Sequence, residues 1–309
     1  PIIGGPAVSG FCQLTESGSL LFIKFLDSPW LVGVLVLAAL ALIGVAVART
    51  DWLNNDDPEL DRERRAGQIA VAALDTLRKR PGAYWISSLI IAVASLLTLL
   101  LADWLVQARP GENIADVDGF ASNVGGVGMA LLAAFILLPV VAMGMATAVE
   151  ITDAIATHRE IDAVTAFRRV LVHPGGWFVA IAVYILVSLL AATWWLLPVA
   201  LFLVAVWAVV LPATELEDQG VVAGMRSSAR LTRGQRFRAM LVGGLLIWLA
   251  FSLPSGVGAI LLLVTGWSFA ATNVVSVVIA AILVPAAAVG LTLLYYDLRR
   301  KAARADATA

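Results

Sequence analysis

The side chains of this sequence that could do chemistry gather in one polar stretch, residues 214–238, which reads TELEDQGVVAGMRSSARLTRGQRFR. If the stretch is helical, Arg226, Arg230 and Arg233 share one face, because they are spaced i, i+4 and i+7. An apolar line runs beside them, made of Val221, Met225 and Ala229. A basic face beside an apolar face is typical of a helix on a membrane surface. We therefore expect the arginines to contact anionic lipid phosphates, either in a defined pocket or through the general attraction of an anionic leaflet.

A charge network is predicted at the cytoplasmic boundary, made of Glu217, Arg226, Asp297 and Arg299. One hypothesis is that Asp297 pairs with an arginine of residues 214–238 and so locks the last span to the surface helix. The alternative is that each charge faces water and only sets the topology, because an exposed ion pair contributes about 0–1 kcal/mol. The sequence leaves both interpretations open.

Few other residues have the chemistry of a catalytic or metal site. Cys12 is the only cysteine, and His158 and His173 are the only histidines. A zinc site needs several such ligands, so we expect no metal and no cofactor. The sequence also lacks paired acids and a serine–histidine pair within its apolar runs, and we expect no catalytic site. Nothing in it suggests a nucleic-acid partner.

The composition places these residues in a membrane protein. Of the 309 residues, 61% are hydrophobic and only 14% are charged, and the mean hydropathy is +0.91. Soluble domains carry about 25% charged residues. The expected fold is all-α: a polytopic transmembrane helical bundle with interfacial amphipathic helices on its cytoplasmic side.

Apolar runs of about 17 residues or more predict the membrane spans. Residues 1–64 form an N-terminal segment with one extra span at 31–47 and an acidic linker at 51–61. Residues 65–300 form a six-span membrane domain, and residues 301–309 form a cytoplasmic tail. The six spans are predicted at 84–105, 127–149, 177–193, 198–213, 240–265 and 269–296. The tripeptide Pro254-Ser255-Gly256 should kink or break the span that contains it.

Three surface helices precede pairs of spans, at 66–77, at 160–172 and within 214–238. Ungapped alignment of their ends superposes Gly82, Gly175 and Gly234, each followed by an aromatic residue. Glycine permits a sharp turn out of the membrane plane. These units are either an internal repeat or three unrelated turns from a surface helix into a span, which are similar because all such turns at the interface look alike.

The distribution of basic residues predicts the orientation. Of the 21 lysines and arginines, only Lys24 and Arg109 fall on one side of this arrangement of spans. The other side is therefore expected to be cytoplasmic. We expect a multi-pass plasma-membrane protein with its C-terminus in the cytoplasm.

Residues 65–300 resemble the membrane domain found attached to glycerophosphoryl diester phosphodiesterases, which also occurs alone in uncharacterised prokaryotic integral membrane proteins. The residues that carry the resemblance are Glu217, Arg226, Ser228, Leu231, Arg233, Gly234 and residues 294–299, LYYDLR. Ser227 stands where that family tends to have a second arginine, and Ala229 where it has an aromatic residue. The resemblance implies six spans in the plasma membrane, with a soluble phosphodiesterase or another membrane subunit as partner. It implies little about activity.

The phosphodiesterases themselves resemble a TIM barrel with His-Arg and Glu-Asn motifs. His158-Arg159-Glu160 and Glu112-Asn113 echo these motifs, but in reversed order and on opposite sides of the membrane. No alternation of strands and helices is present to build a barrel, so we interpret both as coincidence. The chain begins at Pro1 and is expected to be a fragment, so a catalytic domain could lie only upstream.

Two functions remain open at this point. The first is a module without its own catalytic site that interacts with lipids, acts as a scaffold or serves a soluble enzyme. The alternative is a permease or channel-like component, with the proline break and the polar group Thr272, Asn273 and Ser276 as its support. Trp207 and Trp248 are interpreted as packing residues, with a lipid-facing groove beside them as the alternative. A polar cavity at the midplane would favour transport, and a groove open to lipid would favour the module.

Overall fold

The structure is a computed structural model that describes residues 64, 66–107, 124–192, 196–217, 220–265 and 267–308. Within these residues the fold is all-α, without a strand, which confirms the expected helical bundle. The predicted span at 31–47, the acidic linker and residues 108–123 lie outside the described residues.

The described helices are α3 (Ala66–Lys79), α4 (Pro81–Gln107), α6 (Val124–Ala156), α7 (Ala163–Val172), α8 (Gly175–Ala192), α9 (Leu197–Trp207), α10 (Val210–Leu216), α11 (Val221–Leu231), α12 (Arg236–Thr265) and α13 (Phe269–Thr308). Five stretches are long and apolar enough to cross a membrane: Pro81–Thr98, Leu137–Ala156, Leu197–Leu216, Arg236–Leu262 and Ala271–Ala305. A sixth is reached if α7 and α8, which meet at a 72° bend, count as one span. The chain is therefore a multi-pass membrane protein.

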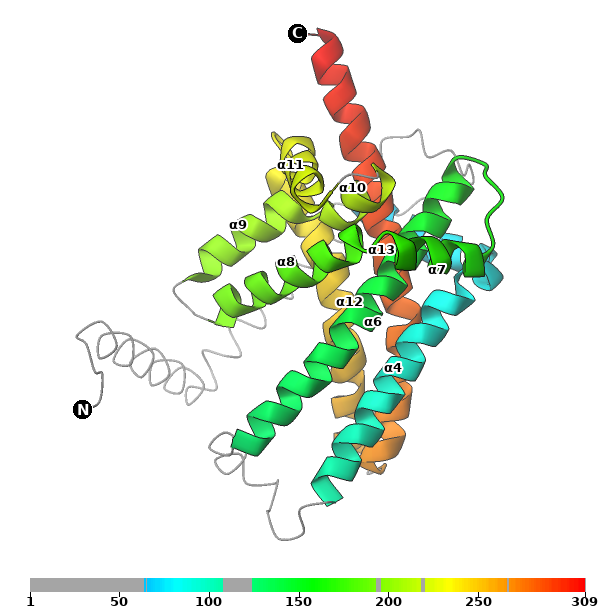
Figure 1. Ribbon diagram of the computed structural model, residues 1–309, viewed down its shortest axis with the longest axis vertical. Coiled ribbons are helices and arrows are strands. Elements are labelled where there is room, and N and C mark those ends of the chain that lie inside the picture. Colours follow the sequence, from blue (N-terminus) through cyan, green and yellow to red (C-terminus); the bar gives the residue numbers. More distant parts are fainter. Residues whose placement is uncertain are drawn as a thin grey trace, which may run out of the picture.

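The long helices and the short helices occupy different ends of the molecule (Figure 1). In that view α4, α6, α12 and α13 run toward the bottom, where α12 connects to α13. The short helices α7, α10 and α11 lie in the upper half, toward the C-terminus. The arginine-bearing helices thus share one end of the bundle with the end of α13.

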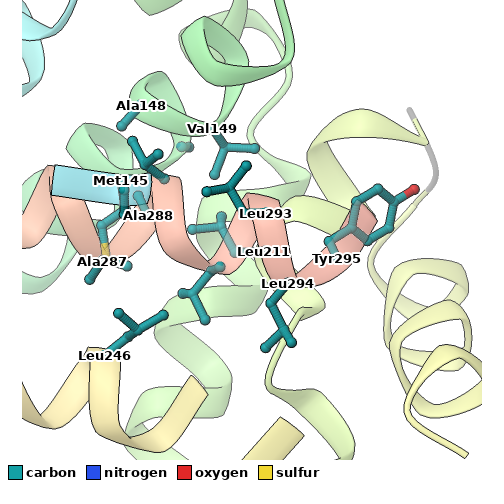
Figure 2. Close-up of a cluster of buried hydrophobic side chains, with 14 of the residues drawn as sticks. Met145, Ala148, Val149, Leu211, Leu246, Ala287, Ala288, Leu293, Leu294 and Tyr295 are labelled. Carbon is teal, nitrogen blue, oxygen red and sulfur yellow. The ribbon is translucent and has the colours of Figure 1, made fainter. Parts of the chain in front are cut away.

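The core is built around α13 and depends on small side chains. Figure 2 shows Ala287 and Ala288 of α13 facing Met145 of α6, with Leu246 of α12 nearby. Gly290 follows on α13, and a Cβ there would lie 2.7 Å from a methyl carbon of Leu246. Small residues let membrane helices approach closely, which replaces the hydrophobic driving force that is missing in lipid.

The predicted span at 198–213 lies within the apolar stretch Leu197–Leu216, which is long enough to cross a membrane, but its helix is interrupted. It consists of α9 and α10, separated by a turn at Ala208 and Val209. Pro212 explains the break, because a proline has no N–H for the carbonyl four residues earlier and its ring clashes with that carbonyl.

The predicted span at 240–265 lies inside α12, which continues through Pro254 without the break that the sequence allowed; the alternative of a kink stays a prediction. The hydroxyl of Ser255 donates hydrogen bonds to the carbonyls of Phe251 and Ser252, at 3.2 and 3.1 Å. Neither bond reaches the carbonyl of Ala250, which is the one that loses its backbone donor at Pro254.

Two further expectations about the surface helices change. The second helix begins at Ala163 rather than at Glu160, because Asp162 caps it by accepting a hydrogen bond from the N–H of Thr165 at 3.3 Å. Of the three aligned glycines, only Gly234 has a left-handed backbone, with φ +84°. Gly82 and Gly175 lie in the first turns of α4 and α8, where their φ values are ordinary.

Candidate functional site

The predicted partner of Asp297 is an arginine of residues 214–238, and the structure places Arg238 there. Nη1 of Arg238 lies 2.5 Å from Oδ2 of Asp297, and the exposed fractions of the two side chains are 20% and 1%. Nζ of Lys301 lies 3.7 Å from the same oxygen. Arg64 donates its backbone N–H to Asp297 at 3.4 Å, and its carbonyl accepts a hydrogen bond from Arg238. Because Arg238 lies on α12, the pair joins α12 to α13 and does not involve α11.

Glu217 has different partners from those expected. Its Oε1 accepts hydrogen bonds from the hydroxyl of Tyr295 at 2.9 Å and from Oγ of Ser227 at 2.8 Å. These contacts connect the end of α10 to α13 and α11. Tyr295 is fully buried, although a tyrosine near the end of a span is typically interfacial. Ser227 makes its bond at a position where the resembled family has arginine.

The helix α11 is held by its small polar side chains. Ser228 and Thr232 are fully buried, and their hydroxyls donate to the carbonyl of Val206 at 3.0 and 3.3 Å. Val206 lies in the last turn of α9, where carbonyls lack partners within the helix. On the same side of α11, Gly224 approaches Thr214 so closely that a Cβ would lie 2.1 Å from the threonine oxygen. The break in the 198–213 span is therefore the docking position of α11.

The arginines of α11 lie away from this contact. Arg226 and Arg230 on α11 and Arg233 just after it are exposed, and so is Arg299 on α13. The predicted four-residue network is therefore divided: Asp297 pairs with the partly exposed Arg238, Glu217 bonds Tyr295 and Ser227, and Arg226 and Arg299 are exposed, with Arg299 also beside Tyr295. The apolar line expected beside the arginines is not the buried face, since Val221 is exposed.

A second polar cluster lies where α6, α7 and α10 meet, and sequence analysis did not predict it. A cavity of about 320 Å³ is present, which we call the charged cavity; it is lined by Glu150, Asp153, Arg159, Arg169, His173, Glu215 and Leu216. Asp153 forms an ion pair with Arg159 and accepts a hydrogen bond from the hydroxyl of Tyr296. Glu150 and Asp153 follow directly after the predicted span at 127–149. Their spacing of three residues is the one signal that could have placed them on a common face.

Two of the cavities among the described residues lie between spans. The larger, about 500 Å³, is lined by uncharged described residues and includes Pro254, Ser255, Thr272, Asn273 and Ser276. Several of its hydroxyls are already used: that of Ser276 donates to the carbonyl of Thr272 at 3.1 Å. The smaller, about 350 Å³, is lined almost entirely by apolar side chains from α6, α8, α9, α10, α12 and α13. We call it the apolar cavity.

The two deep tryptophans belong to the apolar cavity. Trp207 and Trp248 both line it, and 55% of the Trp248 side chain remains exposed. The rings of Tyr184 on α8 and Phe251 on α12 lie 5.8 Å apart across it. A groove beside the tryptophans, one of the two alternatives left open by the sequence, is therefore present.

No family model, curated protein or solved structure matches this chain. The resemblance of residues 65–300 to the phosphodiesterase-associated membrane domain stays a prediction. Arg159, the arginine of the His158-Arg159-Glu160 sequence, forms an ion pair with Asp153. Glu112 and Asn113 lie outside the described residues.

Proposed function

We propose that this chain is a lipid-binding module of the plasma membrane, without catalytic machinery of its own, whose arginine-bearing end faces the cytoplasm. The observation that carries the proposal is the apolar cavity. The described residues that line it are uncharged, and they come from helices that qualify as membrane spans. The exposed basic residues at the end that holds α7 and α11 support the orientation, because cytoplasmic segments are rich in arginine and lysine.

The occupant of the apolar cavity is a phospholipid acyl chain. A spanning helix is surrounded by hydrocarbon, so the exposed ring of Trp248 and the space beside it face lipid. An empty space of this kind lacks dispersion contacts on one side, and a chain that enters it restores them. Because hydrocarbon is the solvent here, the gain comes from packing and not from the hydrophobic effect. The acyl chain alone therefore binds modestly.

The test is to fill the cavity by Ala180→Phe, since Ala180 lines it on α8. The matched control is Ala182→Phe, which places the same ring on the same helix at an exposed position. Phospholipid retained by the purified full chain is counted by native mass spectrometry. We expect several-fold less retained lipid in Ala180→Phe and no change in Ala182→Phe. Equal retention in the wild type and both variants would contradict the proposal.

A soluble phosphodiesterase or another membrane subunit is the partner that the sequence resemblance suggests for such a module. The exposed arginines Arg226, Arg230 and Arg233 are available on the proposed cytoplasmic side for anionic phospholipids or for that partner. At this surface each arginine gains about 1 kcal/mol from an anionic leaflet.

A transport component is the second candidate function, and the cavity of about 500 Å³ favours it. Hydroxyl and amide groups from α4, α12 and α13 line that cavity beside Pro254. Transport requires water in it, which is measurable by replacing Cys12 with serine and introducing Ser276→Cys. A water-soluble thiol reagent should label this cysteine if the cavity is a hydrated pathway. The lipid-binding function predicts that only a lipid-soluble thiol reagent reaches it.

A further inference from the structure

We propose that the charged cavity binds a primary amine that carries a phosphate, which is the chemistry of a phosphoethanolamine headgroup. This inference rests on the proposed lipid-binding function and names the class of lipid. It starts from the position of the cavity, where the end of α6 meets α7 and α10 in the upper half of the bundle (Figure 1).

Three elements place ionisable groups on this cavity. Glu150 and Asp153 share one face at the end of α6, because they are three residues apart. Arg169 comes from the last turn of α7, and His173 follows directly after that helix. The bend between α7 and α8 is fixed by Trp177, whose indole N–H donates to the carbonyl of Val170 at 3.3 Å. This bond holds α7 in place against α8 and so fixes the position of the cavity wall that α7 supplies.

A third carboxylate comes from α10. Glu215 lies so close to the first turn of α8 that a Cβ on Gly176 would be 2.0 Å from its Oε1. The start of a helix favours negative charge, so this position suits a carboxylate. Glycine at position 176 is what gives Glu215 the room to lie there.

The charges are separated by depth. The side chains of Glu150 and Asp153 are 14% and 12% exposed, whereas those of Arg169 and Arg159 are 50% and 49% exposed. Negative charge thus lies inside and positive charge at the rim. Asp153 is already engaged by Arg159 and Tyr296. Glu150 and Arg169 are 3.9 Å apart, which is longer than a hydrogen bond, so both can still serve a ligand.

This arrangement selects among ligand charges. A lone anion would be repelled by three carboxylates, and a lone cation would have to pass two guanidinium groups at the rim. Among the described residues, no group of three histidine, cysteine, aspartate or glutamate side chains is arranged to hold a metal ion. A zwitterion whose ammonium points inward and whose phosphate remains at the rim satisfies both sets of charges.

The amine must carry N–H groups. Carboxylates accept hydrogen bonds from an ammonium, which has three donors, whereas a quaternary amine has none. The volume of about 320 Å³ is near the lower end for small-molecule sites, which suits a headgroup better than a whole lipid. Phosphoethanolamine therefore fits better than phosphocholine or phosphoglycerol.

The position of the charged cavity relative to the apolar cavity connects it to a lipid. Met145 on α6 and Leu211 on α10 line the apolar cavity, and Glu150 and Glu215 line the charged cavity further along the same helices. Five residues of helix correspond to about 7 Å, against about 15 Å for the hydrocarbon of one leaflet. One phospholipid is long enough to contact both.

The experiment measures binding of three lipids with identical acyl chains to the full chain in detergent: phosphatidylethanolamine, phosphatidylcholine and phosphatidylglycerol. We expect the wild type to prefer phosphatidylethanolamine about tenfold, the effect of roughly one well-placed ionic hydrogen bond. Glu150→Gln should remove this preference, whereas Arg169→Gln should weaken the binding of all three lipids, because each carries the phosphate that Arg169 contacts. The controls are Glu160→Gln and Arg168→Gln, which are exposed neighbours outside the cavity and should keep it. Thermal melting verifies that each variant is folded. If Glu150→Gln unfolds, Glu215→Gln is used in its place, because Glu215 is another carboxylate of the same cavity.

Soluble glycerophosphoethanolamine distinguishes the two sources of the same chemistry. If it binds the wild type as tightly as the lipid does, and Glu150→Gln abolishes both, the site is for a soluble phosphoamine. If neither ligand is preferred over its choline counterpart, or if Glu150→Gln keeps the preference, the proposal is overturned. Ala180→Phe should lower the binding of all three lipids without changing the ratio between them. If Ala180→Phe leaves the total bound lipid unchanged while Glu150→Gln loses the headgroup preference, the apolar cavity is refuted as the lipid site and the charged cavity is kept.

Discussion

The pair formed by Asp297 and Arg238 allows the sharpest test of how the spans are held together. Asp297 is buried at the side-chain level, and Arg238 is one-fifth exposed. Breaking a fully buried pair by removing one partner costs about 3–5 kcal/mol, because the other charge stays desolvated. The partial exposure of Arg238 and its second bond to the carbonyl of Arg64 reduce this cost. We expect Asp297→Asn and Arg238→Gln each to destabilise the protein by about 2 kcal/mol.

The double-mutant cycle separates this pair from general charge effects. If the two side chains act together, the double variant is about as unstable as the worse single variant, and the coupling free energy is about 2 kcal/mol. Arg226 provides the control, since it is exposed and has the same charge. Its replacement by glutamine should cost less than about 0.5 kcal/mol and should be additive with Asp297→Asn.

The assay is reversible unfolding of the full chain in mixed micelles, followed by the fluorescence of its tryptophans. Stability differences are taken at a fixed denaturant composition, with the unfolding slope compared between variants. Additivity of Asp297→Asn and Arg238→Gln within about 0.5 kcal/mol would refute the pairing as a stabilising contact. A coupling of Asp297 to Arg226 instead would show that α11, and not α12, is locked to α13.

Two further predictions concern the surface helices. Gly224→Ala should lower the free energy of unfolding by about 1–3 kcal/mol, because the new Cβ would overlap the side chain of Thr214. The control is Gly82→Ala, where nothing lies within 4 Å of the new Cβ, and it should be neutral or slightly stabilising in the same unfolding assay. Hydrogen bonds from Thr165 hold the pKa of Asp162 below its ordinary value, so the cap stabilises α7 above the ordinary pKa of about 3.9 and loses its effect as pH falls through the lowered pKa. Hydrogen exchange of the first turn of α7 should therefore be faster in Asp162→Ala than in the wild type near neutral pH, and this difference should vanish in strong acid; a difference that grew toward acid would contradict the reasoning.

The spans were predictable from sequence because hydropathy is a local property. The predicted spans at 84–105, 127–149 and 269–296 each lie inside one observed helix, α4, α6 and α13. The break between α9 and α10 was missed because residues 198–213 are almost uniformly apolar, so composition hides the effect of Pro212. Proline was considered where it stood beside serine and glycine, at Pro254, and there the helix continues.

The polar contacts were less predictable because their partners are distant in sequence. Several arginines in residues 214–238 could have met Asp297, and only the start of α12 at Arg236 puts Arg238 in its first turn, beside α13. The bond between Tyr295 and Glu217 spans 78 positions. Nothing in the local pattern indicates such a partner. The charged cavity escaped detection for the same reason, since α6, α7 and α10 each supply only part of it.

The attachment of α11 has a consequence for how its arginines meet lipid. A helix that rests on a membrane by an apolar face can move with the lipid, because its contacts are non-directional. In α11 the inward side is instead fixed by directional hydrogen bonds from Ser228 and Thr232 to Val206, and by the close approach of Gly224. Releasing α11 would break the bond from Ser228 to the Val206 carbonyl, at about 1–3 kcal/mol, whereas the hydroxyl of Thr232 would keep its 3.0 Å bond to the carbonyl of Ser228. The arginines are therefore held in a fixed geometry relative to the bundle, as a surface that recognises phosphates in a defined arrangement requires.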